Sequence, residues 1–522
     1  MSRRVLLLAL LLAVAGGAAW GLAFGREPWT IASWLALAPL FPLLGAPGRR
    51  RWTFLLGLLH GLVAWIVALR WIVPTLQTYG GLPAWLAAIS LTVLAGYLAL
   101  YHGVFALLGR TLWRRGGAWA LLGLPSLWVA LEWLRTYLFG GFPWNPAGHA
   151  WVEVPGALPS AAWIGIYGVS WLVLFANGGL ALAVVRRRPS HALTGLLLPL
   201  LVLAVGARWG AGGTADPHRP GWAVAGMPVR LLQPNISNVV EPDWDVITAN
   251  YRQVLEMSEE ACTPGSLVVW PESAAWPYSF ERDSGFRRDV MALARRGRCT
   301  VLFNSIRFTG DHYYNSAYLV APSGPAGLYD KRHLVPFGEY VPLAGVFTWL
   351  DKLARNAGNF RPAEELTLLP WRADELGMAI CYEIVFPAEV AEAVREGATI
   401  LTTITNDAWY GDTAAPWQHY VAARFRAAES RRPLLRAAIT GVSAVVAPDG
   451  TERARLDPFH RGIIEANVEG ERQLSPFTRA PWLVPGASTV VALVALAAAG
   501  GLPRRPRRQG SGGPQTRRSV RL

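Results

Sequence analysis

Cysteine is scarce in this chain, with three among 522 residues. An odd number excludes a framework in which every cysteine is paired, and it leaves at least one free thiol. We therefore expect no disulfide framework, and we interpret Cys262 and Cys299 as small buried apolar residues. Cys381 ends the short apolar run "GMAIC", directly before two polar residues, and is the candidate for chemistry.

Charged residues are also few, at 16% of the chain against about 25% in a soluble domain, while 52% are apolar. This balance excludes an ordinary soluble protein. Runs of about 18 or more apolar residues predict transmembrane helices, because a helix rises about 1.5 Å per residue and the hydrocarbon core is about 30 Å thick. Eight runs qualify: residues 5–24, 30–46, 53–74, 84–109, 117–135, 161–185, 191–209 and 481–502. We interpret the first as a retained anchor, since further membrane segments follow at once.

The net charge of +14 could suit a nucleic-acid partner, but its placement argues against one. Lys and Arg are retained on the cytoplasmic side of membrane proteins. The arginines cluster at 3–4, 49–51, 114–115 and 186–188 and in the tail from 504, which are the N-terminus, alternate loops and the C-terminus. This pattern predicts that both termini are cytoplasmic, with the long segment 210–480 on the other side.

The long segment has the composition of a soluble α/β domain. Short β-rich runs such as "SLVVWPES" and "ATILTTITND" alternate with amphipathic stretches, which predicts a layered sheet with helices packed on it. We expect a seven-helix membrane region at 1–212, a linker at 213–225, the α/β domain at 226–470, a last transmembrane helix at 471–503 and a disordered basic tail at 504–522.

Reactive residues gather at the carboxyl ends of strands in open α/β sheets. Three β-rich runs lead to such candidates: Glu272 in "WPES", Lys331 in "YDKRH" and Cys381 in "CYE". A thiol attacks as thiolate, and its pKa falls near a cation or a helix N-terminus. We expect Lys331 and the helix near Pro387 to lower the pKa of Cys381, with Glu272 accepting its proton.

Four segments carry a resemblance to a known family. "WPES", "YDKRHLVPFGEYVP", "CYEIVFP" and "TNDAWYG", in this order, resemble the motifs of the nitrilase, or carbon-nitrogen hydrolase, superfamily. That superfamily implies an α-β-β-α sandwich with a Glu-Lys-Cys triad. With membrane segments on both sides, and with "EWLRTYLFGGFPW" at 132–144, almost the whole chain is similar to the apolipoprotein N-acyltransferase family.

The resemblance implies roles for named residues. Glu272 would be the general base, Lys331 the electrostatic stabiliser and Cys381 the nucleophile. Residues 336–350 would form an apolar arm near the membrane surface. Supporting residues would be Glu339, Tyr382 and Glu383. The residues that would contact lipid or substrate are the aromatic residues Trp144, Trp244, Tyr340, Trp349, Trp409 and Tyr410. Packing within the domain is the alternative for these aromatic residues.

The resemblance also implies substrates and a location. Such enzymes move an acyl chain from a phospholipid, typically phosphatidylethanolamine, to the α-amino group of an N-terminal diacylglyceryl-cysteine of a lipoprotein. We expect a monomer in the bacterial inner membrane with a periplasmic catalytic domain. The sequence has no HExxH and no GxxxxGK[ST] motif, so we expect no metal or nucleotide cofactor.

Two alternatives remain open at this point. A membrane-tethered amidase of the nitrilase type would use water in place of the amine. A transport or sensing protein would only bind a ligand with its external domain, and Cys381→Ser would then leave its function intact.

Overall fold

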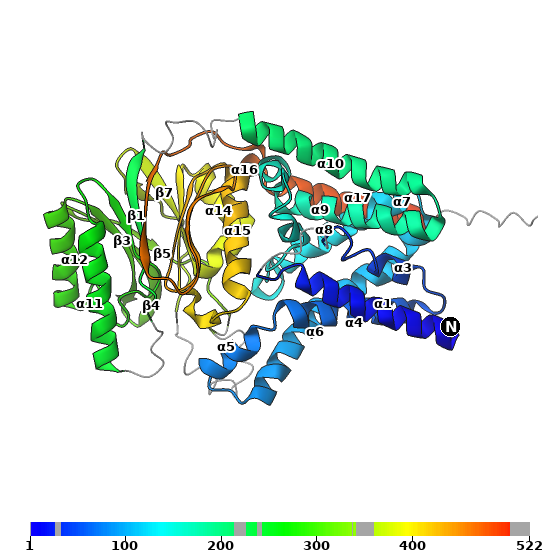
Figure 1. Ribbon diagram of the computed structural model, residues 1–522, viewed down its shortest axis with the longest axis horizontal. Helices are drawn as coiled ribbons and strands as arrows, with labels where there is room; N and C mark the ends of the chain where they lie inside the picture. Colours follow the sequence, from blue (N-terminus) through cyan, green and yellow to red (C-terminus); the bar gives the residue numbers. More distant parts are fainter. Residues whose placement is uncertain are drawn as a thin grey trace, which may run out of the picture.

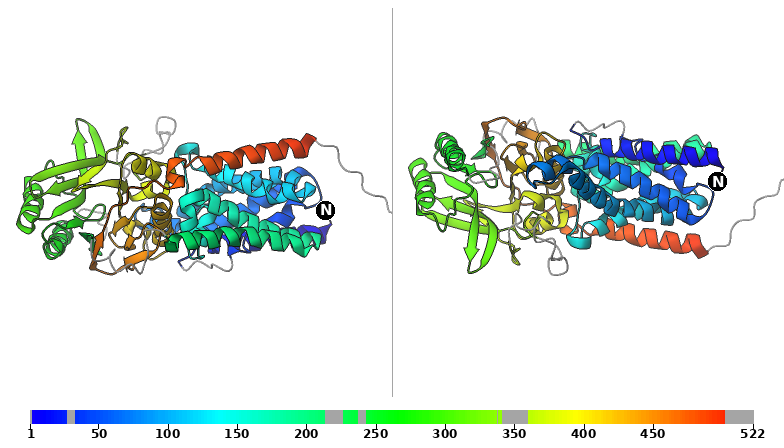
Figure 2. Two further views of the ribbon diagram at one scale, coloured as in Figure 1. Left: turned by 90° about the horizontal axis from the view of Figure 1, so that it is seen from above. Right: turned by 90° about the horizontal axis from the view of Figure 1, so that it is seen from below.

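The computed structural model describes residues 2–26, 33–212, 226–236, 243–336, 338–340 and 360–501. A helical bundle forms one end of the molecule and an α/β domain the other (Figure 1). The N-terminus lies at the end of the bundle remote from the α/β domain. The two further views show the same arrangement, with α17 lying along the bundle (Figure 2).

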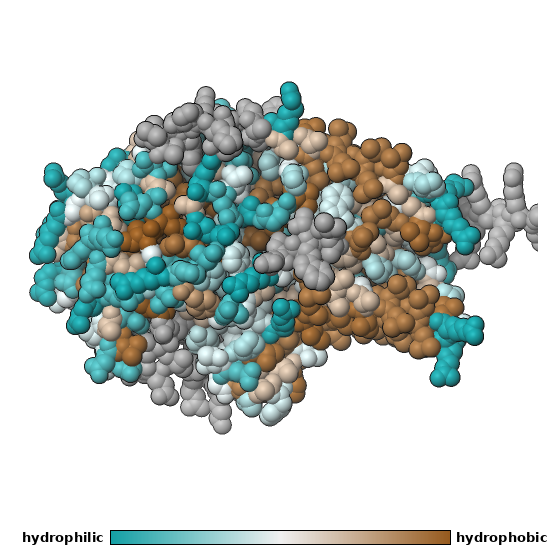
Figure 3. Space-filling view, in the orientation of Figure 1, coloured by the Kyte–Doolittle hydropathy of each residue, from teal (hydrophilic) through white to brown (hydrophobic). Residues whose placement is uncertain are grey.

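Six helices in the described part of the chain are long and apolar enough to cross a membrane. They are α1 (Arg3–Leu22), α4 (Arg50–Ala68), α6 (Ala84–Arg115), α9 (Ala157–Arg186), α10 (Pro189–Gly212) and α17 (Leu483–Gly501). Apolar residues cover much of the bundle surface, whereas hydrophilic residues dominate the surface of the α/β domain (Figure 3). Such a surface fits a bundle that is surrounded by lipid.

Two of the expected membrane segments contain shorter helices. Segment 30–46 holds α3 (Leu40–Leu44), which contains one proline, follows Pro39 and is capped by Gly45. Segment 117–135 holds α7 (Ala118–Leu121) and the 13-residue α8 (Gly123–Arg135). Proline and glycine disfavour continuous helix, and hydropathy alone does not register that.

The α/β domain contains two six-stranded sheets, with strand orders β12-β1-β2-β3-β4-β5 and β11-β10-β9-β8-β7-β6. Buried side chains from both sheets form one apolar cluster between them. The first sheet comprises β1 (Met227–Gln233), β2 (Leu267–Val269), β3 (Thr300–Thr309), β4 (His312–Ala321), β5 (Gly324–Asp330) and β12 (Gly462–Val468). The second comprises β6 (Leu369–Trp371), β7 (Asp374–Ile380), β8 (Ile400–Thr405), β9 (Leu434–Ala438), β10 (Ser443–Val446) and β11 (Glu452–Leu456).

Helices flank the two sheets. α11 (Trp244–Ala261) and α12 (Ser284–Gly297) cover the first sheet on the side remote from the bundle (Figure 1). α14 (Pro387–Arg395) and α15 (Ala415–Ser430) lie between the second sheet and the bundle. Buried residues of α14, α15 and the bundle belong to one continuous apolar core, so the domain is packed directly on the membrane helices.

A single glutamine of α15 joins the domain to several parts of the bundle. The Gln418 Oε1 atom accepts hydrogen bonds from the indoles of Trp71 at 3.1 Å and Trp144 at 2.7 Å. Its Nε2 donates to the carbonyls of Phe24 at 2.8 Å and Ala68 at 3.0 Å. Ala68 is the last residue of α4, and Phe24 lies two residues beyond α1. Since these four bonds lie in a buried junction, they fix α15 relative to the bundle.

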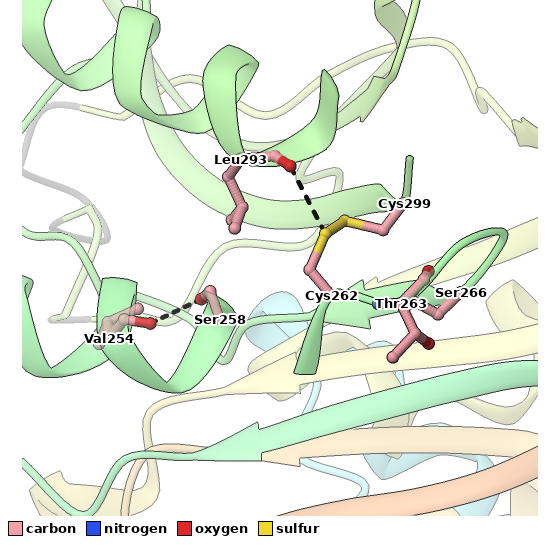
Figure 4. The surroundings of a disulfide bond; sticks show 7 residues. All are labelled: Val254, Ser258, Cys262, Thr263, Ser266, Leu293 and Cys299. Carbon is pink, nitrogen blue, oxygen red and sulfur yellow. Dashed lines mark hydrogen bonds between the residues drawn. A yellow bond between two sulfur atoms is a disulfide. The ribbon is translucent and has the colours of Figure 1, made fainter. Parts of the chain in front are cut away.

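The expectation for two of the cysteines is wrong. Cys262 and Cys299 form a disulfide, and Cys381 is the free cysteine (Figure 4). Cys262 follows the last residue of α11, and Cys299 lies just before β3. Packing of α11 and α12 against the same sheet brings the two sulfurs together across 37 residues, which spacing in the sequence does not reveal.

We expect reduction of this disulfide to lower the free energy of unfolding by about 2–4 kcal/mol, because the crosslink restricts the unfolded chain. Activity should persist where the protein stays folded, since the bond lies in the α11 and α12 layer (Figure 4). Thermal unfolding of the purified protein with and without reductant measures the change. The control is the Cys262→Ala/Cys299→Ala variant, and a reductant effect in that variant would contradict the assignment.

Candidate active site

The three candidate residues lie at strand ends from both sheets. Glu272 follows β2 and Lys331 follows β5 in the first sheet, whereas Cys381 follows β7 in the second. All are buried, with exposed fractions of 7%, 1% and 7%. The Lys331 Nζ atom lies 3.8 Å from Glu272 Oε1. The structure therefore joins the acid and the ammonium into an ion pair.

Glu339 and an asparagine complete a network around the lysine. Lys331 Nζ lies 2.9 Å from Glu339 Oε1. The side-chain amide of Asn315 donates to Glu272 Oε1 at 2.9 Å and to Glu339 Oε1 at 2.7 Å. The other oxygen of Glu272 accepts from the backbone N–H of Asn406 at 3.0 Å. Both oxygens of Glu272 are thus held in place.

Asn315 was missed by the sequence analysis. It lies in β4, where most neighbouring residues are buried, and its own amide oxygen accepts from Asn304 of β3 at 2.7 Å. Asparagine is disfavoured in strands. Two asparagines on consecutive strands were the available signal. They lie diagonally across β3 and β4, so the register of these strands had to be known before the signal could be used.

The nucleophile candidate lies on a sharp turn. Cys381 has φ of 54°, a left-handed conformation that is uncommon for a residue other than glycine. It is also the first residue of the 3-10 helix η4 (Cys381–Val385). The carboxylate of Glu383 accepts from the backbone N–H of Ile380 at 2.7 Å, and from those of Arg332 at 2.7 Å and His333 at 3.0 Å. Glu383 therefore ties this turn to the segment that carries Lys331.

Electrostatics in the resting site differ from expectation. Burial raises the pKa of the Cys381 thiol, and the Glu272 carboxylate raises it further, so that these two effects outweigh Lys331. The expected lowering of this pKa is wrong. Burial alone would lower the pKa of Lys331, but the carboxylates of Glu339 and Glu272 raise it above its usual value. The site thus combines a neutral thiol with an ammonium group, and the thiol needs a base in order to react.

Tyr382 connects the turn to the membrane domain. Its hydroxyl donates to the carbonyl of Gly141 at 3.2 Å, and its ring stacks on Trp144 with a centroid distance of 6.4 Å. The Trp144 side chain is 3% exposed and bonded to Gln418. Trp144 therefore packs at the junction between the two domains.

Two further aromatic candidates lie in the 3-10 helix η5 (Asp407–Tyr410). Trp409 is 43% exposed and packs its ring edge against Tyr79 at 4.9 Å. Tyr410 is partly buried and packs against Trp71 at 4.9 Å. Both residues therefore contact the segment between α4 and α6, and Trp409 keeps an exposed face.

The remaining aromatic candidates are scattered. Trp244 is the first residue of α11 and is 61% exposed. The hydroxyl of Tyr340 lies beside Gly140 of the membrane domain. A Cβ atom added to Gly140 would lie 3.1 Å from this hydroxyl oxygen. Trp349 and most of the predicted arm 336–350 lie outside the described residues.

Comparison with known proteins agrees with this geometry. Residues 228–473 match the carbon-nitrogen hydrolase family, and residues 16–179 match the apolipoprotein N-acyltransferase N-terminal domain. An apolipoprotein N-acyltransferase of Geobacter metallireducens is 34% identical over 501 residues, covering 92% of this chain and 94% of the relative. The chain belongs to the apolipoprotein N-acyltransferase family. A second relative with this name, from Ralstonia nicotianae, is 36% identical over 496 residues and covers 91% of each chain.

The similarity to solved structures covers about half of this chain. Nit3 of Saccharomyces cerevisiae, from the nitrilase superfamily, shares 20% identity with a TM-score of 0.37, covering 47% of this chain and 91% of its own. An amidase from Nesterenkonia sp. shares 18% identity with a TM-score of 0.37, covering 49% and 95%. The family assignment and the six apolar helices of spanning length make the chain a bacterial membrane protein.

Proposed function

We propose that this enzyme transfers an acyl chain from a phospholipid, through a thioester on Cys381, to the α-amino group of the N-terminal diacylglyceryl-cysteine of a lipoprotein. Family membership favours acyl transfer over the amidase alternative. The observation that carries the proposal is the position of the free thiol. Tyr382, its neighbour in the chain, contacts Gly141 of the membrane domain, so the turn with the nucleophile lies against the membrane bundle.

In the first half-reaction, Cys381 Sγ attacks the carbonyl carbon of the glycerol ester while Glu272 takes the thiol proton. The oxyanion that forms is stabilised by the Lys331 ammonium and by the backbone N–H of Tyr382. A preorganised donor of this kind contributes roughly 3 kcal/mol. The C–O bond then breaks, Glu272 returns the proton to the departing alkoxide, and a lysophospholipid leaves.

In the second half-reaction, the lipoprotein amine attacks the thioester carbonyl. The amine must be neutral, and an α-amino group has a pKa of about 7.7–8.0. Glu272 takes a proton from the attacking nitrogen, the C–N bond forms, and the C–S bond breaks as the thiol regains its proton. An amide is more stable than a thioester, so this step needs no ATP. For the first half-reaction, we propose phosphatidylethanolamine as the phospholipid that donates the acyl chain.

The proposed topology has eight membrane passes, with both termini cytoplasmic and the catalytic domain periplasmic. The N-terminus lies at the bundle end remote from that domain (Figure 1). Residues 118–135 together rise about 27 Å at about 1.5 Å per residue, which is close to the thickness of the bilayer core. The Cys262–Cys299 disulfide supports an oxidising compartment, where such bonds persist.

The proposed domains are a membrane region at 1–212, a catalytic α-β-β-α sandwich at 226–470 and a last membrane helix at 471–503. The predicted linker and the predicted disordered tail at 504–522 lie outside the described residues. We propose a monomer, because the Glu272, Lys331 and Cys381 side chains all come from one chain. The aromatic residues proposed for lipid or substrate contact are Trp144, Trp244, Tyr340, Trp349, Trp409 and Tyr410.

We expect the purified protein to add the mass of one acyl chain to a diacylglyceryl-lipopeptide in the presence of phospholipid, and to release one lysophospholipid per product. Mass spectrometry measures both. A lipopeptide with an acetylated N-terminus is the control and should gain no acyl chain. Free fatty acid in place of acylated peptide would favour the amidase, and the absence of any covalent product would favour the binding protein.

A further inference from the structure

A buried polar cluster lies behind the nucleophile turn. The exposed fractions of Asp407, His419 and Arg436 are 1%, 0% and 0%. Asp407 Oδ2 lies 2.7 Å from Arg436 Nη2, and Asp407 Oδ1 lies 3.0 Å from His419 Nδ1. Burial would raise the pKa of Asp407, but Arg436 and His419 lower it below its ordinary value. The aspartate is therefore charged, and it fixes the imidazole ring from one side.

The other ring nitrogen of His419 contacts the nucleophile residue through its backbone. His419 Nε2 lies 3.0 Å from the carbonyl oxygen of Cys381. A carbonyl oxygen only accepts hydrogen bonds, so Nε2 carries a proton and donates. This histidine thus holds the peptide unit that joins Cys381 to Tyr382.

The orientation of that peptide unit decides where its N–H points. The C=O and N–H groups of a trans peptide point in opposite directions within one plane. With the carbonyl of Cys381 directed at His419, the N–H of Tyr382 is directed away from it. In addition, Tyr382 lies in the first turn of η4, where backbone N–H groups have no partner within the helix.

The direction away from His419 leads toward the reacting groups. His419 belongs to α15, which covers the outer side of the second sheet. The Cys381 side chain packs in the cluster between the two sheets, and Glu272 and Lys331 come from the sheet on the other side of that cluster. The N–H of Tyr382 is therefore directed to the side on which an acyl carbonyl would meet the thiol.

We propose that His419 is a positioning residue that aims the backbone N–H of Tyr382 at the oxyanion, with Asp407 and Arg436 orienting its imidazole. This inference rests on one part of the proposed function, namely that a tetrahedral intermediate forms at Cys381.

Two substitutions test the role of the Nε2 donor. In His419→Gln the side-chain amide nitrogen reaches about the position of Nε2, whereas in His419→Asn it reaches only that of Nδ1. We expect His419→Asn to slow acylation of Cys381 by a p-nitrophenyl ester by about a hundredfold, the typical loss for one oxyanion donor. His419→Gln should recover to within about tenfold of the natural protein. Nitrophenolate release measures acylation, so the result is independent of phospholipid and lipoprotein.

Alkylation of Cys381 by iodoacetamide separates this role from a general structural one, because alkylation forms no oxyanion. We expect its rate to stay within about twofold in both variants. Parallel losses in alkylation and acylation, or equal acylation by the Asn and Gln variants, would overturn the proposal. Should His419→Asn fail to fold, Asp407→Asn is the second variant, with acylation slowed about tenfold at unchanged alkylation. Failure of transfer from phospholipid to lipopeptide would count against the proposed function alone.

Discussion

Cys381→Ser is expected to slow acyl transfer by at least about a thousandfold, because it removes the covalent step. A hydroxyl is a much weaker acid than a thiol, so Glu272 cannot deprotonate it in this buried site. The substitution keeps the size of the side chain and makes no new demand on the left-handed backbone, so the fold should persist. Lysophospholipid release measures the rate, and the mass of the intact protein after incubation with phospholipid alone reports the acyl-enzyme.

The matched control for this variant retains Cys381 and loses the two disulfide-bonded cysteines. Cys262→Ser/Cys299→Ser should still form the acyl-enzyme, since Cys262 follows α11 and Cys299 precedes β3, whereas Cys381 packs between the two sheets. Acyl transfer by Cys381→Ser at more than about a tenth of the natural rate would contradict the nucleophile assignment. The covalent intermediate would then have to form on another residue.

The positions of the candidate residues could be predicted because strand ends and motif order are local features. Glu272, Lys331 and Cys381 each follow a short apolar strand, and the structure places all three at the ends of those strands. These three residues come from different sheets, so their positions relative to one another depend on how the two sheets pack face to face. The α/β character of the domain and its position between membrane segments followed in the same way from composition.

Other features depend on tertiary contacts that no short stretch reveals. Asn315 bridges Glu272 and Glu339 only because β3, β4 and β5 are neighbours. The Cys262–Cys299 bond depends on how two helices pack on one sheet. The raised pKa of the Cys381 thiol depends on burial, which the nearby positive charge of Lys331 does not overcome.

Burial of the site bears on the choice between water and an amine. Water would hydrolyse a thioester, so a transferase gains from a nucleophile with little solvent access. Cys381 is 7% exposed, and the adjacent Tyr382 stacks on Trp144 at the junction with the bundle. The packing of Tyr382 on Trp144 therefore leaves the thiol beside the membrane helices, with little access for water.

Lys331→Met is expected to abolish acyl transfer and to lower the free energy of unfolding by about 3–5 kcal/mol, the typical cost of removing one partner from a buried ion pair. Lys331 is 1% exposed and lies 2.9 Å from Glu339 and 3.8 Å from Glu272. Without the ammonium, both carboxylates face Asn315 in a buried site with uncompensated charge. Thermal unfolding in detergent measures the loss of stability, and lysophospholipid release measures activity.

A double variant separates the structural effect of the lysine from its chemical one. In Lys331→Met/Glu339→Gln the second carboxylate is gone, and only Glu272 remains, with its hydrogen bonds from Asn315 and Asn406. Much of the lost stability should therefore return. Activity should stay absent, because no ammonium faces the oxyanion. Recovery of acyl transfer together with stability would contradict the assigned role, since it would mean that Lys331 serves only to neutralise Glu339.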